Sequence, residues 1–143
     1  MRKMVFGRKL SRGKKAREAL LKSLARAIIS EGKIITTVAK AKAVKGRVEK
    51  LVSLAKKKTL ASRRKAYADL GNDRKTVDKL FGTVAKTFLE RTGGYTRVVF
   101  LPPRQGDKAK MVRLEWAEEI KKEEKPEKGK KDENIPAKSK RNK

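Results

Sequence analysis

The chain contains no cysteine and no histidine. Without cysteine it can form no disulfide, no thiolate zinc site and no cysteine nucleophile. Without histidine it lacks the commonest general base and the commonest protein ligand for metals. Its apolar runs are far shorter than the roughly 18 residues that predict a membrane-spanning helix. These absences argue against an enzyme, and we expect no cofactor, no small-molecule substrate and no membrane partner.

Acidic residues are also scarce. The 143 residues include 16 Asp and Glu against 42 Lys and Arg, so the formal net charge is +26. So large an excess of cations repels itself until phosphates neutralise it, which favours a nucleic acid as the partner. Aromatic residues are few, with one Trp, two Tyr and four Phe. Because a core needs most of them, Tyr95 and Trp116 are better explained as core residues than as platforms for bases.

The basic residues divide the chain into three parts. Residues 1–17 contain no acidic residue and follow no helical period, which predicts an extended or loosely turned basic arm. Residues 18–116 contain enough apolar side chains for one modest core. Residues 117–143 are rich in Lys and Glu with little to bury, which is typical of a disordered tail. The basic residues of the arm are Arg2, Lys3, Arg8, Lys9, Arg12, Lys14, Lys15 and Arg17.

Apolar periodicity in the core predicts four to five helices. A first helix ends at Gly32, and a second begins after Thr36 or Thr37. A third covers about residues 60–70, and Asp73 can cap a fourth that is broken near Gly82 and stopped by Gly93-Gly94. The expected stripe of the first helix is Ala16, Ala19, Leu20, Ser23, Leu24, Ala27 and Ile28. That of the second is Ala41, Val44, Val48, Leu51, Val52 and Ala55, and that of the fourth is Val77, Leu80, Phe81, Val84, Ala85 and Phe88.

Three segments have the character of strands. Residues 33–36 are β-branched, and residues 95–101 and 111–116 alternate with a period of two. In the last segment Val112, Leu114 and Trp116 share one face. The basic connection 104–110 favours antiparallel pairing of the last two strands. The sequence therefore predicts an α+β fold, with the helices packed on one face of a small three-stranded sheet.

Motifs for small ligands are weak. The glycines of residues 7–15 have the wrong spacing for a nucleotide-binding loop, and no strand precedes them. Asp69, Asp73 and Asp78 fit a helix end, a cap and a solvated face better than a metal site.

The start of the second helix is a candidate phosphate site, because N–H groups at a helix N-terminus bind phosphate. The residues concerned are Thr36, Thr37, Lys40, Lys42 and Lys45. The alternative, that these lysines are the solvated face of an amphipathic helix, carries about equal weight. Lysines in the first turn oppose the helix dipole, which slightly favours a phosphate partner.

Five blocks of sequence occur in the order and spacing of a known family. They are Gly7-Arg8-Lys9-Leu10, Ala19-Leu20-Leu21, Thr36-Thr37-Val38-Ala39-Lys40-Ala41-Lys42, Gly93-Gly94-Tyr95-Thr96-Arg97 and Pro103-Arg104-Gln105-Gly106-Asp107. From Met1 to about Trp116 the chain resembles ribosomal protein seventeen of the bacterial large subunit. The resemblance does not extend to the tail.

This resemblance implies a structural protein of the cytoplasmic ribosome. It implies an α+β domain bound to large-subunit rRNA near the nascent-peptide exit, beside neighbouring large-subunit ribosomal proteins, with the basic arm threaded into RNA. It also adds Arg97 and Arg104, which lie in matching blocks, to the expected rRNA-binding residues. The dispersed charge and the few aromatics favour phosphate and ribose contacts over base recognition.

Two other classes of protein share this composition. A nucleoid-type DNA-binding protein would bind duplex DNA and RNA with similar affinity, without a folded RNA site. A free-standing RNA chaperone would act largely through disordered basic segments and would tolerate loss of the core. Stable presence in large subunits after a high-salt wash fits only the ribosomal interpretation.

Overall fold

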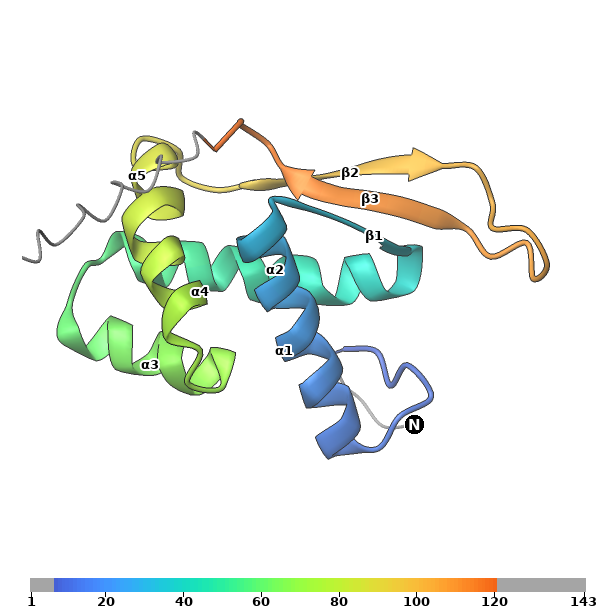
Figure 1. The fold of residues 1–143 in the computed structure, drawn as a ribbon, viewed down its shortest axis with the longest axis horizontal. Helices are drawn as coiled ribbons and strands as arrows, with labels where there is room; N and C mark the ends of the chain where they lie inside the picture. The colour runs from blue at the N-terminus through green and yellow to red at the C-terminus, as the bar shows by residue number, and fades with distance from the viewer. Residues whose placement is uncertain (1–6, 121–143) are drawn as a thin grey trace, which may run out of the picture.

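The computed structural model describes residues 7–120. Arg2 and Lys3 of the arm and residues 121–143 of the tail lie outside the described residues. The elements follow in the order α1 (Lys14–Glu31), β1 (Lys33–Thr37), α2 (Val38–Lys56), α3 (Leu60–Leu70), α4 (Arg74–Lys79), a π-helical turn (Leu80–Val84), α5 (Ala85–Thr87), β2 (Thr96–Leu101) and β3 (Met111–Trp116). Figure 1 shows a layer of helices below a sheet.

The sheet is three-stranded and antiparallel, with the order β1-β3-β2. Leu114 of β3 pairs with Ile34 of β1 on one side and with Val98 of β2 on the other. Since α4, the π-helical turn and α5 follow one another directly, they form one rod, and the described part of the chain then holds four helices. The predicted fold class, an α+β domain of helices on a small three-stranded sheet, is confirmed.

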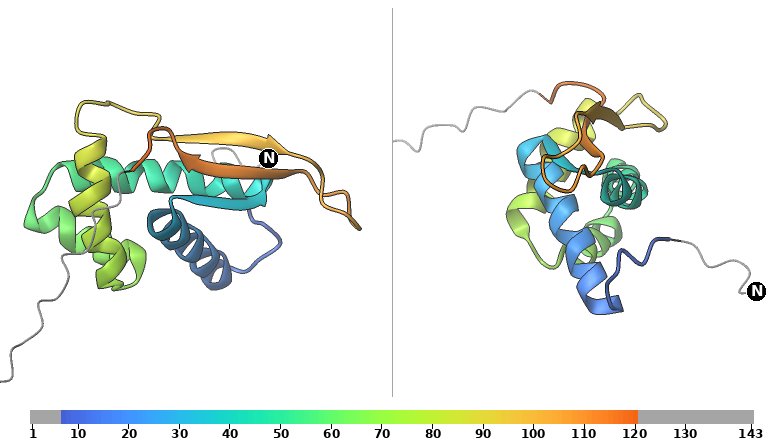
Figure 2. Two further views of the ribbon diagram at one scale, coloured as in Figure 1. Left: turned by 45° about the horizontal axis from the view of Figure 1, so that its top comes forward. Right: turned by 90° about the vertical axis from the view of Figure 1, so that its right-hand side faces the viewer.

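The helix α2 packs against one face of the sheet. It runs below the strands in Figures 1 and 2, and all six residues of its predicted stripe are buried. Val112, Leu114 and Trp116 of β3 point to this side and are buried, as their alternation predicts. No described element covers the other face, where Ile35 of β1 is 65% exposed. The core therefore lies between one face of the sheet and the helical layer.

The predicted stripe of α1 is partly wrong. Ala16, Ala19 and Ser23 are exposed, whereas Ala25, Ile28 and Ile29 are buried. The N-terminal half of α1 extends past the other helices, as Figure 1 shows, so its small residues have nothing to pack against. The helix also begins at Lys14, within the range assigned to the arm, so Lys14, Lys15 and Arg17 are helical.

Aromatic side chains hold the end of the α4–α5 rod against the sheet. The ring centroid of Phe88 lies 5.4 Å from that of Tyr95 and 5.7 Å from that of Trp116. Tyr95 and Trp116 are buried, which confirms their assignment to the core. The expected end of this helix at Gly93-Gly94 is wrong, because α5 ends at Thr87. The helix does not break near Gly82 as expected: it continues through a π-helical turn that contains this residue and changes only the hydrogen-bond pattern.

Candidate nucleic-acid interface

The described part of the arm turns back against the helices. The backbone N–H of Arg12 donates to the carbonyl oxygen of Lys9 at 3.2 Å, and its guanidinium donates to the carbonyl oxygen of Leu10 at 2.9 Å. Leu10 and Ser11 both have positive φ angles, of 54° and 50°. Two successive left-handed residues reverse the direction of the chain. This turn connects residues 7–9 to the start of α1.

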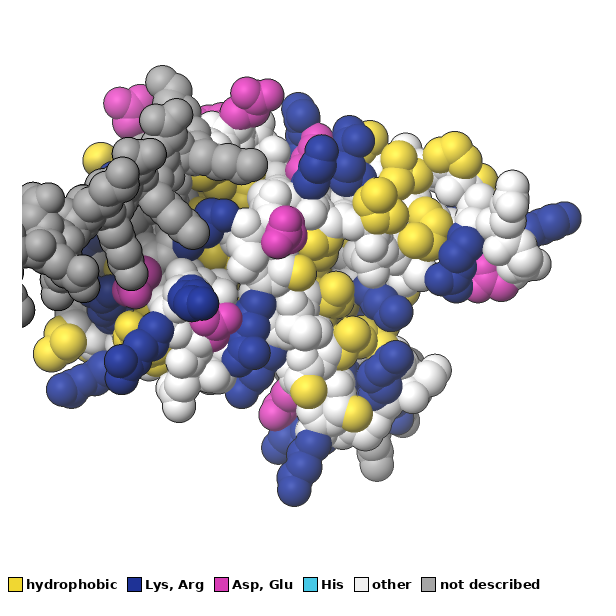
Figure 3. Space-filling view, in the orientation of Figure 1, with side chains coloured by type: hydrophobic (Ala, Val, Ile, Leu, Met, Phe, Trp, Pro, Cys, Tyr) yellow, Lys and Arg dark blue, Asp and Glu magenta, His cyan; other side chains and the backbone are white. Residues whose placement is uncertain are grey.

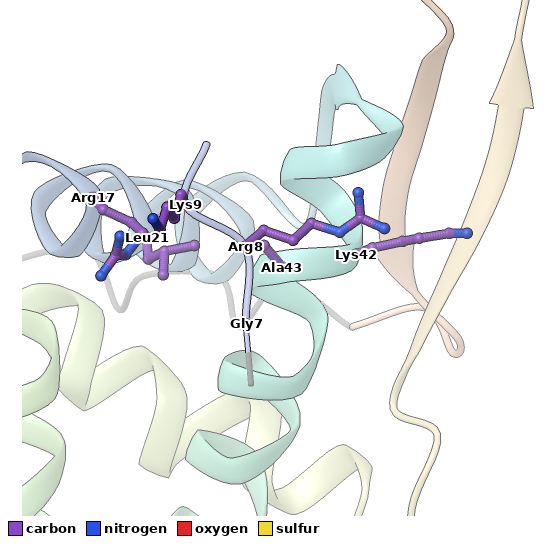
Figure 4. A pocket seen from close by; sticks show the side chains of 7 residues that line it. All are labelled: Gly7, Arg8, Lys9, Arg17, Leu21, Lys42 and Ala43. Carbon is purple, nitrogen blue, oxygen red and sulfur yellow. The ribbon is translucent and has the colours of Figure 1, made fainter. Parts of the chain in front are cut away.

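The arm closes one side of a concavity against α1 and α2, here called the arm concavity. It is lined by Gly7, Arg8 and Lys9 of the arm, Arg17 and Leu21 of α1, and Lys42 and Ala43 of α2. Figure 4 shows the side chains of Arg8 and Lys42 extending in the same direction, while Lys9 and Arg17 lie beside Leu21. The arm, α1 and α2 thus place four cations around one concavity.

The charge in the arm concavity is of one sign. None of its lining residues is acidic, and within residues 7–120 its four cations make no ion pair. Cations held together repel one another, and an anion between them removes the repulsion. Arginine binds phosphate through two parallel hydrogen bonds and lysine as a point charge, so this set suits a phosphodiester backbone.

The start of α2 contributes unequally to this surface. Thr37 is the N-cap, but its side chain makes no capping hydrogen bond, and Thr36 is only 7% exposed because it faces the core side of the sheet. Lys45 lies 3.9 Å from a carboxylate oxygen of Glu49, one turn further along. Lys42 is exposed and joins the arm concavity, and Lys40 is half-buried. The five candidate residues therefore do not form one cluster.

The remaining arm candidates in the described part of the chain, Arg12, Lys14 and Lys15, are solvent-exposed. Lys14 and Lys15 lie in the first turn of α1, whose N-cap is Gly13 and offers no capping side chain. Because cations in a first turn oppose the helix dipole, an anion near these N–H groups would stabilise both.

The two candidates on the β2–β3 hairpin are engaged by carboxylates. Arg97 donates to Glu115 at 2.6 Å, and this hydrogen bond lowers the pKa of the Glu115 carboxyl. Arg104 donates twice to Asp107, at 3.2 and 2.6 Å. These bonds and one from the backbone N–H of Ala109 lower the pKa of Asp107 to about 2. Arg104 is therefore locally neutralised, whereas Arg97 shares the single charge of Glu115 with Arg113, whose Nε atom lies 2.7 Å from that carboxylate.

A second basic cluster lies outside the five sequence blocks that carry the family resemblance. Arg63 and Arg64 of α3 and Arg74 of α4 line one surface pocket. The sequence separates them by a helix end and a turn, so only the packing of α3 against α4 brings them together. Only Arg74 is adjacent to the turn Gly71-Asn72-Asp73, and this turn between two short helices is the one sequence feature that could have indicated the cluster.

The described residues hold neither a metal site nor a helix that could cross a membrane. Residues 7–120 contain no group of three or more Asp, Glu, Cys or His side chains that could hold a metal ion. No helix among them has both the length and the apolar character to cross a membrane.

Comparison with known proteins identifies the family. The model of the ribosomal protein L17 family matches residues 20–117, which span most of α1 to the end of β3. The chain belongs to the ribosomal protein L17 family. This confirms the resemblance stated from the sequence. Because the family is one of structural ribosomal proteins, the expectation that the chain is not an enzyme is also confirmed.

Two relatives in the L17 family are matched over nearly all of their own length. A large ribosomal subunit protein bL17 from Natranaerobius thermophilus is 52% identical over 111 residues, covering 78% of this chain and 97% of the relative. One from Persephonella marina is 49% identical over 124 residues, covering 86% of this chain and all of the relative. The L17 family model itself begins at residue 20, so the arm lies outside that match.

Proposed function

We propose that the protein is a structural constituent of the large ribosomal subunit that binds folded rRNA through phosphate and ribose contacts. The observation that carries this proposal is the arm concavity, which is lined by the four cations Arg8, Lys9, Arg17 and Lys42 and by no acidic residue. The relatives named as large ribosomal subunit proteins support the same function. As part of the ribosome the protein works in the cytoplasm, in contact with rRNA and neighbouring subunit proteins, and needs no cofactor.

The proposed mode of binding is recognition of backbone shape. Tyr95 and Trp116 are buried, and the large aromatic side chain most exposed in the described residues is Phe100 of β2, at 70%. Base recognition by stacking needs several exposed aromatics on one platform, and this surface does not supply them. Phosphate contacts fix position and orientation without reading bases. We also propose, from what the resemblance implies, that the protein lies near the nascent-peptide exit.

Sedimentation tests the ribosomal function directly. The tagged full-length chain, expressed in a bacterium whose own family member is deleted, should be found in large subunits and stay there through a high-salt wash. Absence from the subunits would overturn the proposal. Equal affinity for duplex DNA and for rRNA would instead indicate a nucleoid-type protein, and binding that survives loss of residues 18–116 would indicate an RNA chaperone.

A cross-linking experiment tests the proposed location near the nascent-peptide exit. A cross-linker placed in an emerging nascent peptide should react with this protein in assembled ribosomes. Reaction with other subunit proteins only would reject the location at the exit and would leave the ribosomal function standing.

A further inference from the structure

A second concave surface lies on the other side of the helical layer. This α3–α4 pocket is lined by Arg63, Arg64, Tyr67, Asn72, Arg74 and Asp78 and shares no residue with the arm concavity. In Figure 1, α3 and α4 form the left end of the helical layer, while the arm lies to the right of α1. Figure 3 shows Lys and Arg side chains gathered at both of these ends.

The turn between α3 and α4 is held in place from α1. The Nε atom of Arg26 donates to the carbonyl oxygen of Leu70 at 2.6 Å, and its Nη2 atom donates to that of Gly71 at 3.0 Å. Asp73 then caps α4 by accepting from the backbone N–H of Thr76 at 3.3 Å and from its hydroxyl at 2.6 Å. Because these bonds fix where α4 starts, Arg74 at its first position is fixed relative to α3.

One cation of the α3–α4 pocket is neutralised within the protein. Arg63 is hydrogen-bonded to Asp78, which raises the pKa of the arginine, and its guanidinium lies 5.8 Å from the centroid of the Phe81 ring. Asp78 is the only acidic residue that lines the pocket in the described part of the chain. The charge of Asp78 therefore compensates that of Arg63 and not that of Arg64 or Arg74.

Arg64 and Arg74 are left with their charge uncompensated. Both are exposed, and among residues 7–120 neither side chain has a hydrogen-bond or ion-pair partner. Tyr67 and Asn72 line the same pocket and offer uncharged donors. Two guanidinium forks flanked by neutral donors match an anion that has several oxygens, such as a phosphodiester.

We propose that the α3–α4 pocket is a second binding site for the rRNA phosphate backbone, so that the protein bridges two separate segments of rRNA. This inference rests on the proposed ribosomal function. The arm concavity is lined by the arm, α1 and α2, whereas the α3–α4 pocket lies at the other end of the helical layer in Figure 1, so we assign each site its own stretch of backbone. Each site then holds its own segment, and the rigid helical layer sets the distance between the segments.

Hydroxyl-radical footprinting on full-length, protein-free large-subunit rRNA tests the bridge. The pocket variant is Arg64→Gln with Arg74→Gln, and the arm variant is Arg8→Gln with Lys42→Gln. The control variant is Lys50→Gln with Lys57→Gln, which removes the same charge from exposed positions in α2 and directly after it that line neither site. Thermal unfolding followed by circular dichroism should be the same for all four proteins, since all the substituted side chains are exposed.

The parent protein should protect two segments of rRNA that are separate in sequence. The pocket variant should lose one protection and keep the other, and the arm variant should show the reverse. Because two phosphate contacts are lost, the fall in affinity between 50 and 200 mM salt should become about 7–12-fold smaller for the pocket variant than for the parent. The control variant should keep both protections.

Three results would overturn the inference. Unchanged protections in the pocket variant would show that Arg64 and Arg74 do not touch RNA. Equal losses in the pocket and control variants would show an effect of net charge alone. Loss of a cross-link to a subunit protein in place of an RNA protection would assign the pocket to a protein partner. Failure of the proposed function is distinguishable, because the parent protein would then give no specific protections at all.

Discussion

Arg26 and Gly71 are in contact across the helical layer, with the Nη2 atom of Arg26 donating to the carbonyl oxygen of Gly71 at 3.0 Å. Gly71 has a φ of +69°, and a Cβ atom at this position would lie 2.5 Å from the same Nη2 atom. A side chain at Gly71 is therefore strained in its backbone and also displaces the arginine that holds the turn. We expect Gly71→Ala to lower the free energy of unfolding by about 1–2 kcal/mol, measured by urea denaturation. A change near zero would mean that the turn relaxes without cost.

Gly46→Ala should change stability in the opposite direction. Gly46 lies in the interior of α2, its φ is not positive, and nothing lies within 4 Å of an added Cβ. Alanine then gains the helix propensity that glycine lacks, about 0.8–1 kcal/mol, without a steric cost. The same urea titration, run beside the parent, should show a higher midpoint with an unchanged slope. A lower midpoint would contradict this account of α2.

Neutralising the arm concavity should weaken RNA binding without affecting the core. The triple variant removes three of the four cations that line the concavity. Its substitutions are Arg8→Gln, Lys9→Gln and Lys42→Gln. A parent with roughly 6–10 phosphate contacts loses about 10³–10⁵-fold in affinity between 50 and 200 mM salt, and the variant's log–log slope should be shallower by about 2–3. Filter binding to rRNA gives the slope, and calorimetry should give an unchanged melting temperature.

Two outcomes would speak against that prediction. Affinity equal to the parent's at physiological salt would mean that the concavity is only a solvated surface. A lowered melting temperature would mean that the arm packs as part of the core. A matched variant, Lys50→Gln with Lys57→Gln, separates local contact from loss of overall charge.

The Arg104–Asp107 pair should persist into strong acid. The pKa of Asp107 is lowered to about 2, chiefly by hydrogen bonds from Arg104. A carboxyl whose folded pKa is depressed stabilises the fold above its unfolded pKa, and this contribution is lost as the pH falls through the folded value. In an NMR titration the Asp107 carboxyl signal should therefore have its midpoint near pH 2, and Arg104→Gln should move the midpoint up toward the ordinary range of aspartate. An identical midpoint in both proteins would show that Arg104 is not the cause.

Elements with a complete amphipathic period could be predicted from the sequence. In α2 every predicted stripe residue is buried, because the helix packs against the sheet and against α1, α3 and the α4–α5 rod. The strand β3 behaves in the same way, with Val112, Leu114 and Trp116 facing the helices. Asp73 was predicted as a cap from its position after a turn, and it does cap α4, because this bond is local.

Features that depend on tertiary packing could not be predicted. The exposed half of α1 has the same small apolar residues as a buried helix, and only the extent of its neighbours decides that Ala16 and Ala19 face solvent. The partners of Arg97 and Arg104 depend on strand register and loop conformation. Periodicity does not report the meeting of Arg64 and Arg74 either, since it describes one helix at a time. Whether the proposed contacts with rRNA are made is a prediction that the experiments above address.

The strand order has a consequence for how the chain is made. Both β1 and β2 pair only with β3, which is the last of the described elements to be synthesised and yet lies in the middle of the sheet. Until Met111–Trp116 emerge, neither outer strand has a partner for its backbone N–H and C=O groups, and the upper side of α2 stays open to water. Translation therefore delivers the helices first and closes the domain with one late strand. A nascent chain stalled before Met111 would leave the apolar face of α2 exposed to water and the edges of β1 and β2 unpaired. Such a form is prone to aggregation.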